Sequence, residues 1–209
     1  AWWVRRIRHM CSIYDVVRID HFRGFAGYYA IPYGNKTAEG GRWRTGPGYA
    51  LFAAIKKKLG EPRIIAEDLG FLTDDVNALL RKCGYPGMKV LEFGFDSRDG
   101  GDYRPHGYPV NSIAYVGTHD NEPVNGWMAT AAPEDVARAV RYLNLTKQEG
   151  YHWGMMRGIW ASAAELSIVQ AQDLLGLGHE ARMNTPSTLG GNWCWRAKRG
   201  AFNDRLAVK

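Results

Sequence analysis

Short apolar strands alternate with amphipathic helices along this chain, and this alternation constrains the fold more than any other feature of the sequence. The periodicity predicts strands over residues 14–20, 63–66, 88–95 and 112–116. It predicts helices over residues 2–13, 49–59, 73–82 and 153–170, and a further helix that begins at residue 133. Strands that alternate with helices in this way form a mainly parallel sheet, so the sequence predicts an α/β fold.

The length of the chain limits how much of such a fold it can contain. Its 209 residues suffice for one sizeable core, whereas a complete (β/α)8 TIM barrel takes about 250 residues. A fifth strand is expected near Arg182. The count therefore predicts a partial (β/α)8 barrel, roughly its second half, with strands 4 to 8.

Composition argues against several classes of protein. The net formal charge is +6, but the Lys and Arg residues are scattered and no nucleic-acid recognition motif is visible, so we expect no nucleic-acid partner. The three cysteines are far apart and lack CxxC spacing, which disfavours a disulfide framework or a zinc site and fits a reducing compartment. Arg157 and Glu165 interrupt the longest apolar stretch, so we expect no membrane partner.

Three of the predicted strands end in acidic residues. VVRID ends at Asp20, RIIAED at Glu67 and Asp68, and IAYVGTHD at Asp120. In a β/α barrel the carboxyl ends of the strands converge on the active site. Converging carboxylates suit glycosyl transfer, in which one carboxylate attacks and a protonated second serves as acid and then base. They also suit a divalent metal site with oxygen ligands.

Arg18 favours the first of these chemistries. It lies two residues before Asp20, so a strand points both side chains to the same face. A nearby guanidinium keeps a carboxylate ionised, as a nucleophile requires, whereas metal sites seldom place a fixed cation against a ligand. The plainer alternatives are a structural salt bridge between Arg18 and Asp20, and a helix-capping role for Glu67 or Asp68.

Four motifs carry a resemblance to a known family: VVRIDHFRGF, IIAEDLG, GTHDNE and HEARMNTPSTLGGNWCWR. In this order and spacing they resemble the 4-α-glucanotransferases (amylomaltases, disproportionating enzymes) of glycoside hydrolase family 77, from WWVRRIRH to WCWR. The resemblance implies retaining transfer of α-1,4-glucan segments between maltooligosaccharides or starch and glycogen chains, without a cofactor or metal. It also implies that residues 1–209 are the C-terminal part of a catalytic (β/α)8 barrel, whose N-terminal half would be a partner for activity.

The resemblance implies catalytic roles for the three acids. Asp20 matches the nucleophile, Glu67 the general acid/base, and Asp120 the carboxylate that stabilises the oxocarbenium-like transition state. The carboxyl groups of a retaining pair should stand about 5–5.5 Å apart. Glu67 should also stay protonated near neutral pH, through burial or neighbouring negative charge.

The same resemblance implies a set of substrate-binding residues. Arg18 matches the Arg beside the nucleophile, and His119 matches the His that hydrogen-bonds sugar hydroxyls. Asn184 is expected to contact the same sugar, and His21 to line the acceptor side. The Gly-rich loop over residues 24–48 is a candidate acceptor platform or simply a packed loop, through its aromatic residues Tyr28, Tyr29, Tyr33 and Trp43.

Two other functions stay open beside the transferase. One is an α-amylase-type glucan hydrolase with the same acids, and the other is a catalytically inert glucan-binding fragment; a metal-dependent barrel enzyme is a more distant alternative. The HEARMNTPST segment favours the transferase, because it resembles that family in particular. The expected location is the cytoplasm, or the plastid stroma in a plant.

Overall fold

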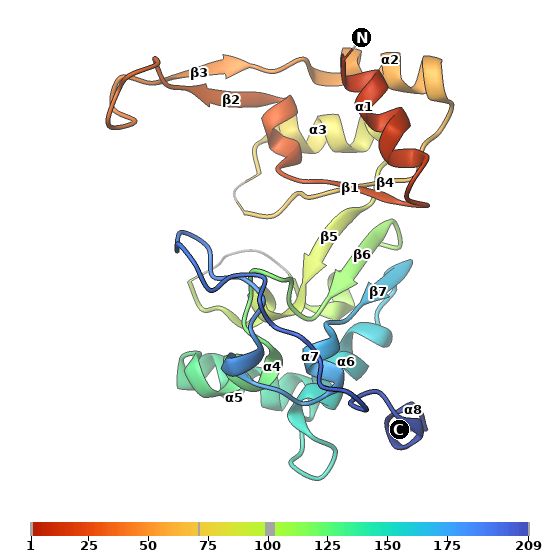
Figure 1. Cartoon of the computed structure of the whole chain (residues 1–209), viewed down its shortest axis with the longest axis vertical. Coiled ribbons are helices and arrows are strands. Elements are labelled where there is room, and N and C mark those ends of the chain that lie inside the picture. The colour runs from red at the N-terminus through yellow and green to blue at the C-terminus, as the bar shows by residue number, and fades with distance from the viewer. Residues whose placement is uncertain (1, 71, 99–102, 209) are drawn as a thin grey trace. The chain divides into compact units, whose positions relative to one another are not determined.

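The computed structural model describes residues 2–70, 72–98 and 103–208. They divide into two compact units, Ala1–Met88 and Lys89–Lys209, each of which has its own core and is considered by itself (Figure 1). The boundary falls inside the third predicted strand. None of the described helices is long and apolar enough to cross a membrane.

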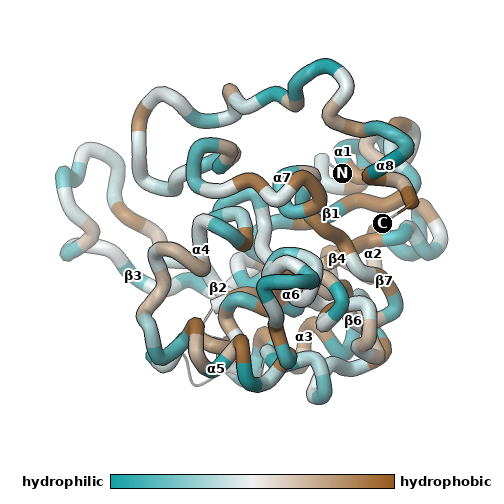
Figure 2. The backbone as a smooth tube through the Cα atoms, turned by 90° about the horizontal axis from the view of Figure 1, so that it is seen from below, coloured by the Kyte–Doolittle hydropathy of each residue, from teal (hydrophilic) through white to brown (hydrophobic). Residues whose placement is uncertain are grey.

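The first unit packs three helices around a pair of parallel strands. The helices are α1 (Trp2–Cys11), α2 (Gly48–Leu59) and α3 (Asp74–Cys83), and the strands are β1 (Val17–Ile19) and β4 (Ile64–Ala66). The two strands are parallel, with Ile19 opposite Ala66, as the alternation of elements predicted. All three residues of β4 are buried, and the strand is hydrophobic along its whole length (Figure 2).

An aromatic cluster forms the core of this unit. Phe22, which lies in the 3-10 helix η1 (Phe22–Phe25), is fully buried. Its ring centroid lies 5.2 Å from that of Phe52 and 6.3 Å from that of Tyr85. Complete burial of such a ring contributes roughly 2–3 kcal/mol. The chain directly after β1 is therefore anchored to the core.

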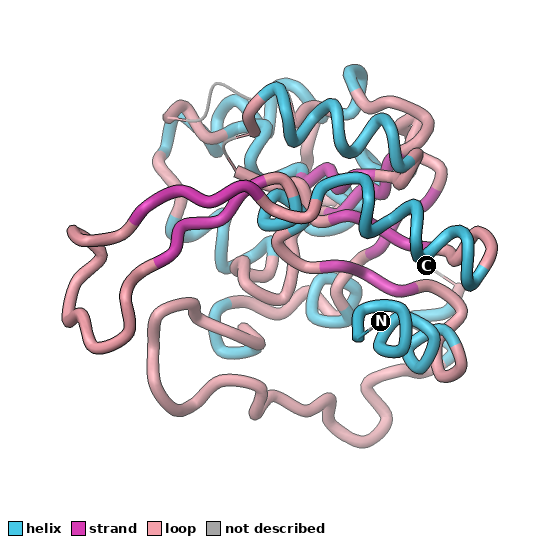
Figure 3. The backbone as a smooth tube through the Cα atoms, turned by 90° about the horizontal axis from the view of Figure 1, so that it is seen from above, coloured by secondary structure: helices cyan, strands magenta, loops and turns pink. Residues whose placement is uncertain are grey.

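The segment over residues 24–48 is more ordered than the loop expected from its glycines. It contains an antiparallel hairpin of β2 (Gly27–Ala30) and β3 (Arg42–Thr45), whose two strands run side by side in Figure 3. Tyr29 and Trp43 face each other across the ladder with ring centroids 5.6 Å apart. Aromatic residues favour strands and pair across them, so they outweigh the glycines here.

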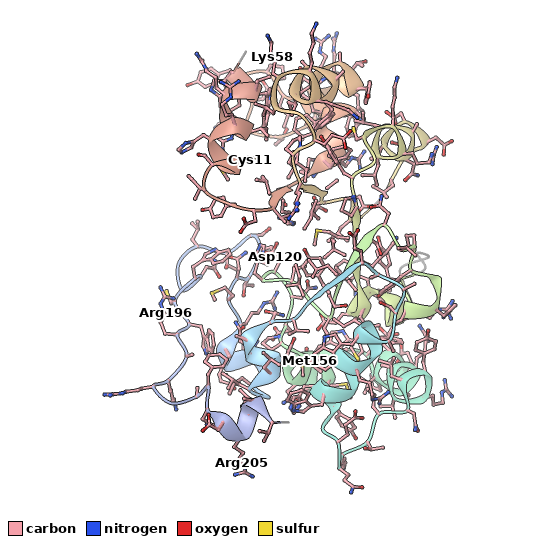
Figure 4. All side chains as sticks on the ribbon, turned by 90° about the vertical axis from the view of Figure 1, so that its right-hand side faces the viewer. Cys11, Lys58, Asp120, Met156, Arg196 and Arg205 are labelled. Atoms are coloured by element: carbon pink, nitrogen blue, oxygen red, sulfur yellow. The ribbon has the colours of Figure 1, made fainter. Side chains whose placement is uncertain are left out.

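The second unit combines a three-stranded sheet with four main helices. The sheet has the order β5 (Gly87–Val90), β6 (Ser112–Tyr115), β7 (Leu166–Ile168), and β6 and β7 are parallel. The helices are α4 (Val124–Thr130), α5 (Pro133–Leu143), α6 (Tyr151–Trp160) and α7 (Ala171–Leu174). Met155, Met156 and Ile159 of α6 are fully buried in the core of this unit, and Figure 4 labels Met156.

Short elements complete the second unit. They are the 3-10 helices η2 (Leu91–Phe95), η3 (Pro105–Gly107) and η4 (His179–Ala181), and the short helix α8 (Asp204–Ala207). Between η4 and α8 the chain contains no helix or strand, and Figure 3 draws this long segment as a loop. It includes the motif that ends in WCWR.

Several predicted boundaries are wrong. The strand predicted over 88–95 begins at Gly87, ends at Val90 and continues as η2. The helix predicted over 153–170 ends at Trp160, and Leu166–Ile168 is instead the strand β7. No strand forms near Arg182, which follows η4, so β7 takes the place of the expected fifth strand. Pairing with β6 decides the structure of this apolar run, because its local pattern suits either a strand or a helix.

The described strands form three small sheets, of two, two and three strands. The sequence predicted one continuous sheet of barrel strands, and the described strands do not form such a sheet. The predicted ends of two helices agree with the structure to within one residue: α2 ends at Leu59 and α3 at Cys83, and Gly60 and Gly84 follow them with positive φ. The architecture is accordingly a mixed α/β fold.

Candidate active site

Asp20 follows β1 directly and forms an ion pair with Arg18. The Arg18 Nη2 lies 2.9 Å from the Asp20 Oδ1, and the Arg18 Nε donates to the sulfur of Met88 at 3.2 Å. The Asp20 side chain is 76% exposed, so this ion pair contributes at most about 1 kcal/mol to stability. The predicted placement of both side chains on one face is confirmed. The Asp20 carboxylate is accessible and has a cation beside it.

Glu67 follows β4, and main-chain amides hold both of its carboxyl oxygens. The His21 N–H donates to the Glu67 Oε2 at 2.6 Å, and the Leu69 N–H donates to the Oε1 at 2.8 Å. The Glu67 main chain is itself paired, since its N–H donates to Ile19 O and its carbonyl accepts from the Phe22 N–H. His21 immediately precedes the 3-10 helix η1 and Leu69 lies in a loop, so the Glu67 carboxyl group joins the start of η1 to the chain that follows β4.

His21 adopts an unusual backbone conformation between these two acids. Its φ of 48° and ψ of 54° lie in the left-handed region, which few non-glycine residues occupy. This turn points the His21 N–H at the Glu67 carboxyl group. Ile19 lies opposite Ala66 in the parallel pair, so Asp20 and Glu67 follow neighbouring strands at the same register. The first unit thus presents both acids at one sheet edge.

Asp68 is the buried neighbour of Glu67. One of its carboxylate oxygens accepts the Met88 N–H at 2.6 Å, in the strand β5. A Cβ on Gly87 would meet the Asp68 carboxylate at 2.3 Å, so only glycine fits at that position. Asp68 therefore links the chain that follows β4 to Met88, the last residue of the first unit.

Asp120 lies in the second unit, in the turn that follows β6. Its Oδ1 accepts a hydrogen bond from the Asn184 Nδ2 at 2.6 Å, and its Oδ2 lies 3.5 Å from the His119 Nε2. Its N–H donates to the Thr118 Oγ1 at 3.3 Å. The Asn184 N–H also donates to the His119 carbonyl. His119, Asp120 and Asn184, which the resemblance singled out, are therefore neighbours in the structure.

Trp193 adds an exposed ring to this group. Its ring centroid lies 5.1 Å from that of His119, and its N–H donates to the Met183 carbonyl at 2.7 Å. Trp193 is 54% exposed and has a φ of 62°, again in the left-handed region. Trp193 lies within the motif HEARMNTPSTLGGNWCWR, but no role was predicted for it. An aromatic face beside His119 is suited to stacking on an apolar ligand face.

Arg182 and Glu122 form an ion pair that contacts the main chain of the Asp120 turn. Neither residue was predicted from the sequence. The Arg182 Nη1 lies 2.5 Å from the Glu122 Oε1, and its Nη2 donates to the Asp120 carbonyl at 2.6 Å. The Glu122 carboxylate is also 2.9 Å from the His179 Nδ1. Glu122 ends the GTHDNE motif and Arg182 lies within HEARMNTPST, so their membership of these motifs was a usable signal.

Two acids of the second unit, Glu92 and Asp173, are buried, and Glu92 interacts electrostatically with both members of this ion pair. Burial raises the pKa of Glu92 well above its ordinary range, and the charges of Asp173 and Glu122 raise it further, against the opposing effect of Arg182. Burial raises the pKa of Asp173 to about 6, although its Oδ1 accepts the Val124 N–H at 2.7 Å. One carboxyl oxygen of each acid is buried without a hydrogen-bond partner among the described residues. Burial thus disfavours the ionised form of both groups relative to an exposed carboxyl.

The hairpin aromatics are surface residues. Tyr28, Tyr29 and Trp43 are exposed, and the Arg23 guanidinium lies 5.4 Å from the Trp43 ring centroid. Tyr33, near the hairpin tip, is fully exposed. Across residues 2–70, 72–98 and 103–208, no three His, Cys, Asp or Glu side chains lie close enough together to hold a metal ion.

The family profile and the relatives found by comparison with known proteins all carry the same description, 4-alpha-glucanotransferase. The 4-alpha-glucanotransferase family profile matches residues 1–202. The chain is 50% identical over 209 residues to the 4-alpha-glucanotransferase of Clostridium butyricum, covering 100% of this chain and 43% of that protein. It is 46% identical to the chloroplastic/amyloplastic 4-alpha-glucanotransferase of Arabidopsis thaliana, covering 100% of this chain and 36% of that protein.

A solved structure is similar as well. The amylomaltase of Streptococcus agalactiae, solved in complex with acarbose, matches with a TM-score of 0.93 and 41% sequence identity. The match covers 99% of this chain and 42% of that one. The chain thus spans about two fifths of the length of the relatives that it matches.

Proposed function

The chain belongs to the 4-alpha-glucanotransferase family, and from this membership we propose that it carries the catalytic acids for transfer of α-1,4-glucan segments. The donors and acceptors would be maltooligosaccharides or starch and glycogen chains. The observation that carries the proposal is the orientation of the acids. Asp20 and Glu67 follow neighbouring parallel strands and are fixed by Arg18 and by main-chain amides, and His119 and Asn184 orient Asp120.

The proposed mechanism is a retaining double displacement. The Asp20 carboxylate attacks the anomeric carbon of the donor, while Glu67 gives its proton to the departing glycosidic oxygen. A covalent glucosyl-enzyme forms and the shortened glucan leaves. Glu67, now a carboxylate, takes the proton of an acceptor 4-hydroxyl, whose oxygen attacks the anomeric carbon and releases Asp20. Arg18 would pair with the Asp20 carboxylate that attacks in the first step and is released in the second.

Glu67 can carry its proton without losing its orientation. Each of its carboxyl oxygens accepts one main-chain N–H, and each has a second lone pair where a proton can sit. The amides of His21 and Leu69 would thus hold the carboxyl group in one position in both protonation states. This is what a group that alternates between acid and base requires.

Asp120 would act on the sugar ring. Its carboxylate is half-exposed and has Asn184 on one oxygen and His119 near the other. We assign to it the stabilisation of the positive charge that develops on the ring in the transition state. His119 and Asn184 would contact hydroxyls of the same sugar, Trp193 would stack on it, and His21 would line the acceptor side.

The fold that we propose for this function is the second half of a (β/α)8 barrel, strands 4 to 8, over residues 1–209. The parallel pair β1–β4 in the first unit, and the order β5–β6–β7 with the parallel pair β6–β7 in the second, support it. An N-terminal barrel half would be the partner that completes the substrate site. The proposed location is the cytoplasm, or the plastid stroma in a plant.

The test uses this chain alone and a chimera in which residues 1–209 replace the matching segment of the Clostridium butyricum relative. Each is incubated with maltotriose and the products are separated by chromatography. The proposal predicts glucose together with a ladder of longer maltooligosaccharides from the chimera. Glucose and maltose without longer products would indicate the hydrolase instead. A folded chimera that leaves maltotriose unchanged would indicate the inert glucan-binding fragment.

A further inference from the structure

A single guanidinium ties together the two main-chain segments that carry Asp120 and Asn184. The Arg182 Nη2 donates to the Asp120 carbonyl at 2.6 Å, and its Nε donates to the Asn184 carbonyl at 3.0 Å. The two segments are far apart in sequence, since Arg182 is 62 residues from Asp120. Because the guanidinium is planar and rigid, its donors fix the positions of both carbonyls together.

The side chains of the same two residues are linked in turn. The Asn184 Nδ2 donates to the Asp120 Oδ1 at 2.6 Å, and the Asn184 N–H donates to the His119 carbonyl at 3.1 Å. A shift in either main chain would therefore move the Asp120 carboxylate. The position of that carboxylate depends on Arg182, although Arg182 does not touch it.

Glu122 holds the guanidinium in place. Its carboxylate pairs with the Arg182 Nη1, and the two side chains are only 13% and 20% exposed. His179 contacts the same carboxylate at 2.9 Å, and a Cβ on Gly126 would meet its other oxygen at 2.6 Å. Glu122 is thus confined, and a partly buried carboxylate of this kind needs the positive charge of Arg182.

We propose that Arg182 is a positioning residue for the transferase reaction: with Glu122 as its counter-ion, it sets the location of the Asp120 carboxylate through the main-chain carbonyls of Asp120 and Asn184. This inference rests on the proposed function of Asp120. It assigns two separable properties to Arg182. Its positive charge stabilises the fold next to Glu122, and its rigid fork of donors places Asp120.

Two substitutions separate these properties in the chimera. Arg182→Lys keeps the charge but replaces the fork by a single ammonium, which cannot reach both carbonyls in fixed geometry. Arg182→Gln removes the charge as well. We expect kcat to fall about 10-fold to 100-fold in both variants, because small misplacements of a catalytic group have effects of this size. The KM should change less than about 3-fold, since the remaining sugar contacts stay in place.

The thermal stability of the two variants should depend on whether the positive charge at position 182 is kept, and not on the guanidinium geometry. The thermal midpoint of Arg182→Lys should stay within about 3 °C of the parent, and that of Arg182→Gln should fall by about 5 °C or more. Arg157→Lys is the matched control. Arg157 also binds a carboxylate, that of Glu149, at 2.7 Å and a main-chain carbonyl, that of Leu143, at 3.1 Å. We expect its kcat to equal that of the parent.

The outcomes distinguish this inference from the proposed function. If the parent chimera shows no transfer, or if Glu67→Gln transfers as well as the parent, the proposed function fails before Arg182 is compared. If the parent transfers and Arg182→Lys keeps more than half of its kcat, the positioning role is wrong. An equal loss of kcat in Arg157→Lys, or a loss that follows the thermal midpoints, would also overturn it.

Discussion

The two units orient their acids by different means. In the first unit the strand-end pair, Asp20 and Glu67, is fixed mainly by main-chain amides and by one exposed ion pair with Arg18. In the second unit Asp120 is held mainly by side chains: Asn184 binds its carboxylate, and Arg182, paired with Glu122, binds its carbonyl. The buried acids Glu92 and Asp173 belong to the same group of charges. We call Glu122, Arg182, Asn184, Glu92 and Asp173 the Asp120 network.

This difference has consequences for mutation and for pH. Main-chain hydrogen-bond donors do not titrate and remain after side-chain substitution. Substitution of Asp20 or Glu67 should therefore change the stability of the fold little and the transfer activity greatly. Every member of the Asp120 network except Asn184 is ionisable, and these four side chains are buried or largely buried, where charge is costly. Its stability should therefore depend on pH and on single side chains.

Removal of either acid of the strand-end pair should nearly abolish transfer. We expect Asp20→Asn and Glu67→Gln to lower kcat in the chimera by about 10³-fold or more, because each variant lacks a group that takes part in bond breaking. The free energy of unfolding should change by less than about 2 kcal/mol. Asp20 is exposed, and the amide oxygen of the glutamine in Glu67→Gln can still accept one of the two main-chain N–H groups.

Product chromatography and urea unfolding measure these two effects separately. The comparison between the units predicts that activity falls while the unfolding transition stays close to that of the parent. A loss of stability well above this limit in either variant would show that the strand-end pair is a structural element as much as a chemical one.

Loss of the aromatic anchor should destabilise the first unit. We expect Phe22→Ala to lower the free energy of unfolding by about 3–5 kcal/mol, because Phe22 is fully buried among Phe25, Phe52 and Tyr85. Phe22 also donates its N–H to the Glu67 carbonyl. Urea unfolding of this chain is the measurement, and Tyr33→Ala, at a fully exposed position, is the control. A loss below about 1 kcal/mol would show that the cluster does not anchor this strand end.

The Asp120 network should make stability fall as pH rises. The pKa of Asp173 is raised from 3.8 to about 6 by burial, so between these pH values the native state keeps a proton that the unfolded chain has released. The free energy of unfolding should fall by roughly 3 kcal/mol through this window as a result. Glu92, whose pKa is also raised, contributes in the same direction.

Asp173→Asn should remove the Asp173 part of this dependence. The asparagine keeps an oxygen to accept the Val124 N–H but cannot ionise. The difference in unfolding free energy between variant and parent should therefore change by roughly 3 kcal/mol between about pH 4 and pH 6. Chemical denaturation at several pH values measures it, with Glu61→Gln on the exposed surface of the first unit as control. Parallel pH profiles of parent and Asp173→Asn would contradict the buried-acid description.

The acids could be placed from the sequence because Asp20 and Glu67 directly follow short β-branched runs, and Asp120 lies in the GTHD turn after a further strand. Asp20 after β1, Glu67 after β4 and Asp120 after β6 are local features, and the Arg18 position followed from strand alternation. The strand β7 was missed because LSI suits a helix or a strand until it pairs with β6. The Arg182–Glu122 pair was missed because it joins residues 60 positions apart, which no local pattern reports.

The smallest effect is expected at the hairpin. Trp43→Ala removes the cross-strand contact with Tyr29 and the cation–π contact with Arg23, and should lower the free energy of unfolding by about 1 kcal/mol. If the hairpin is an acceptor platform, the KM for glucose or maltose as acceptor should rise while the donor KM stays unchanged. An unchanged acceptor KM would leave packing as the role of these aromatics.

The nucleophile assignment of Asp20 can be tested by trapping the intermediate. The Glu67→Gln chimera is treated with α-maltosyl fluoride, whose fluoride leaves without an acid, so the covalent intermediate forms and then persists because the base is absent. Trypsin releases Asp20 in the peptide IDHFR, residues 19–23, and mass spectrometry locates the added sugar. The account predicts a maltosyl group on this peptide. A maltosyl group on another peptide, or no adduct in a folded chimera whose parent transfers, would contradict it.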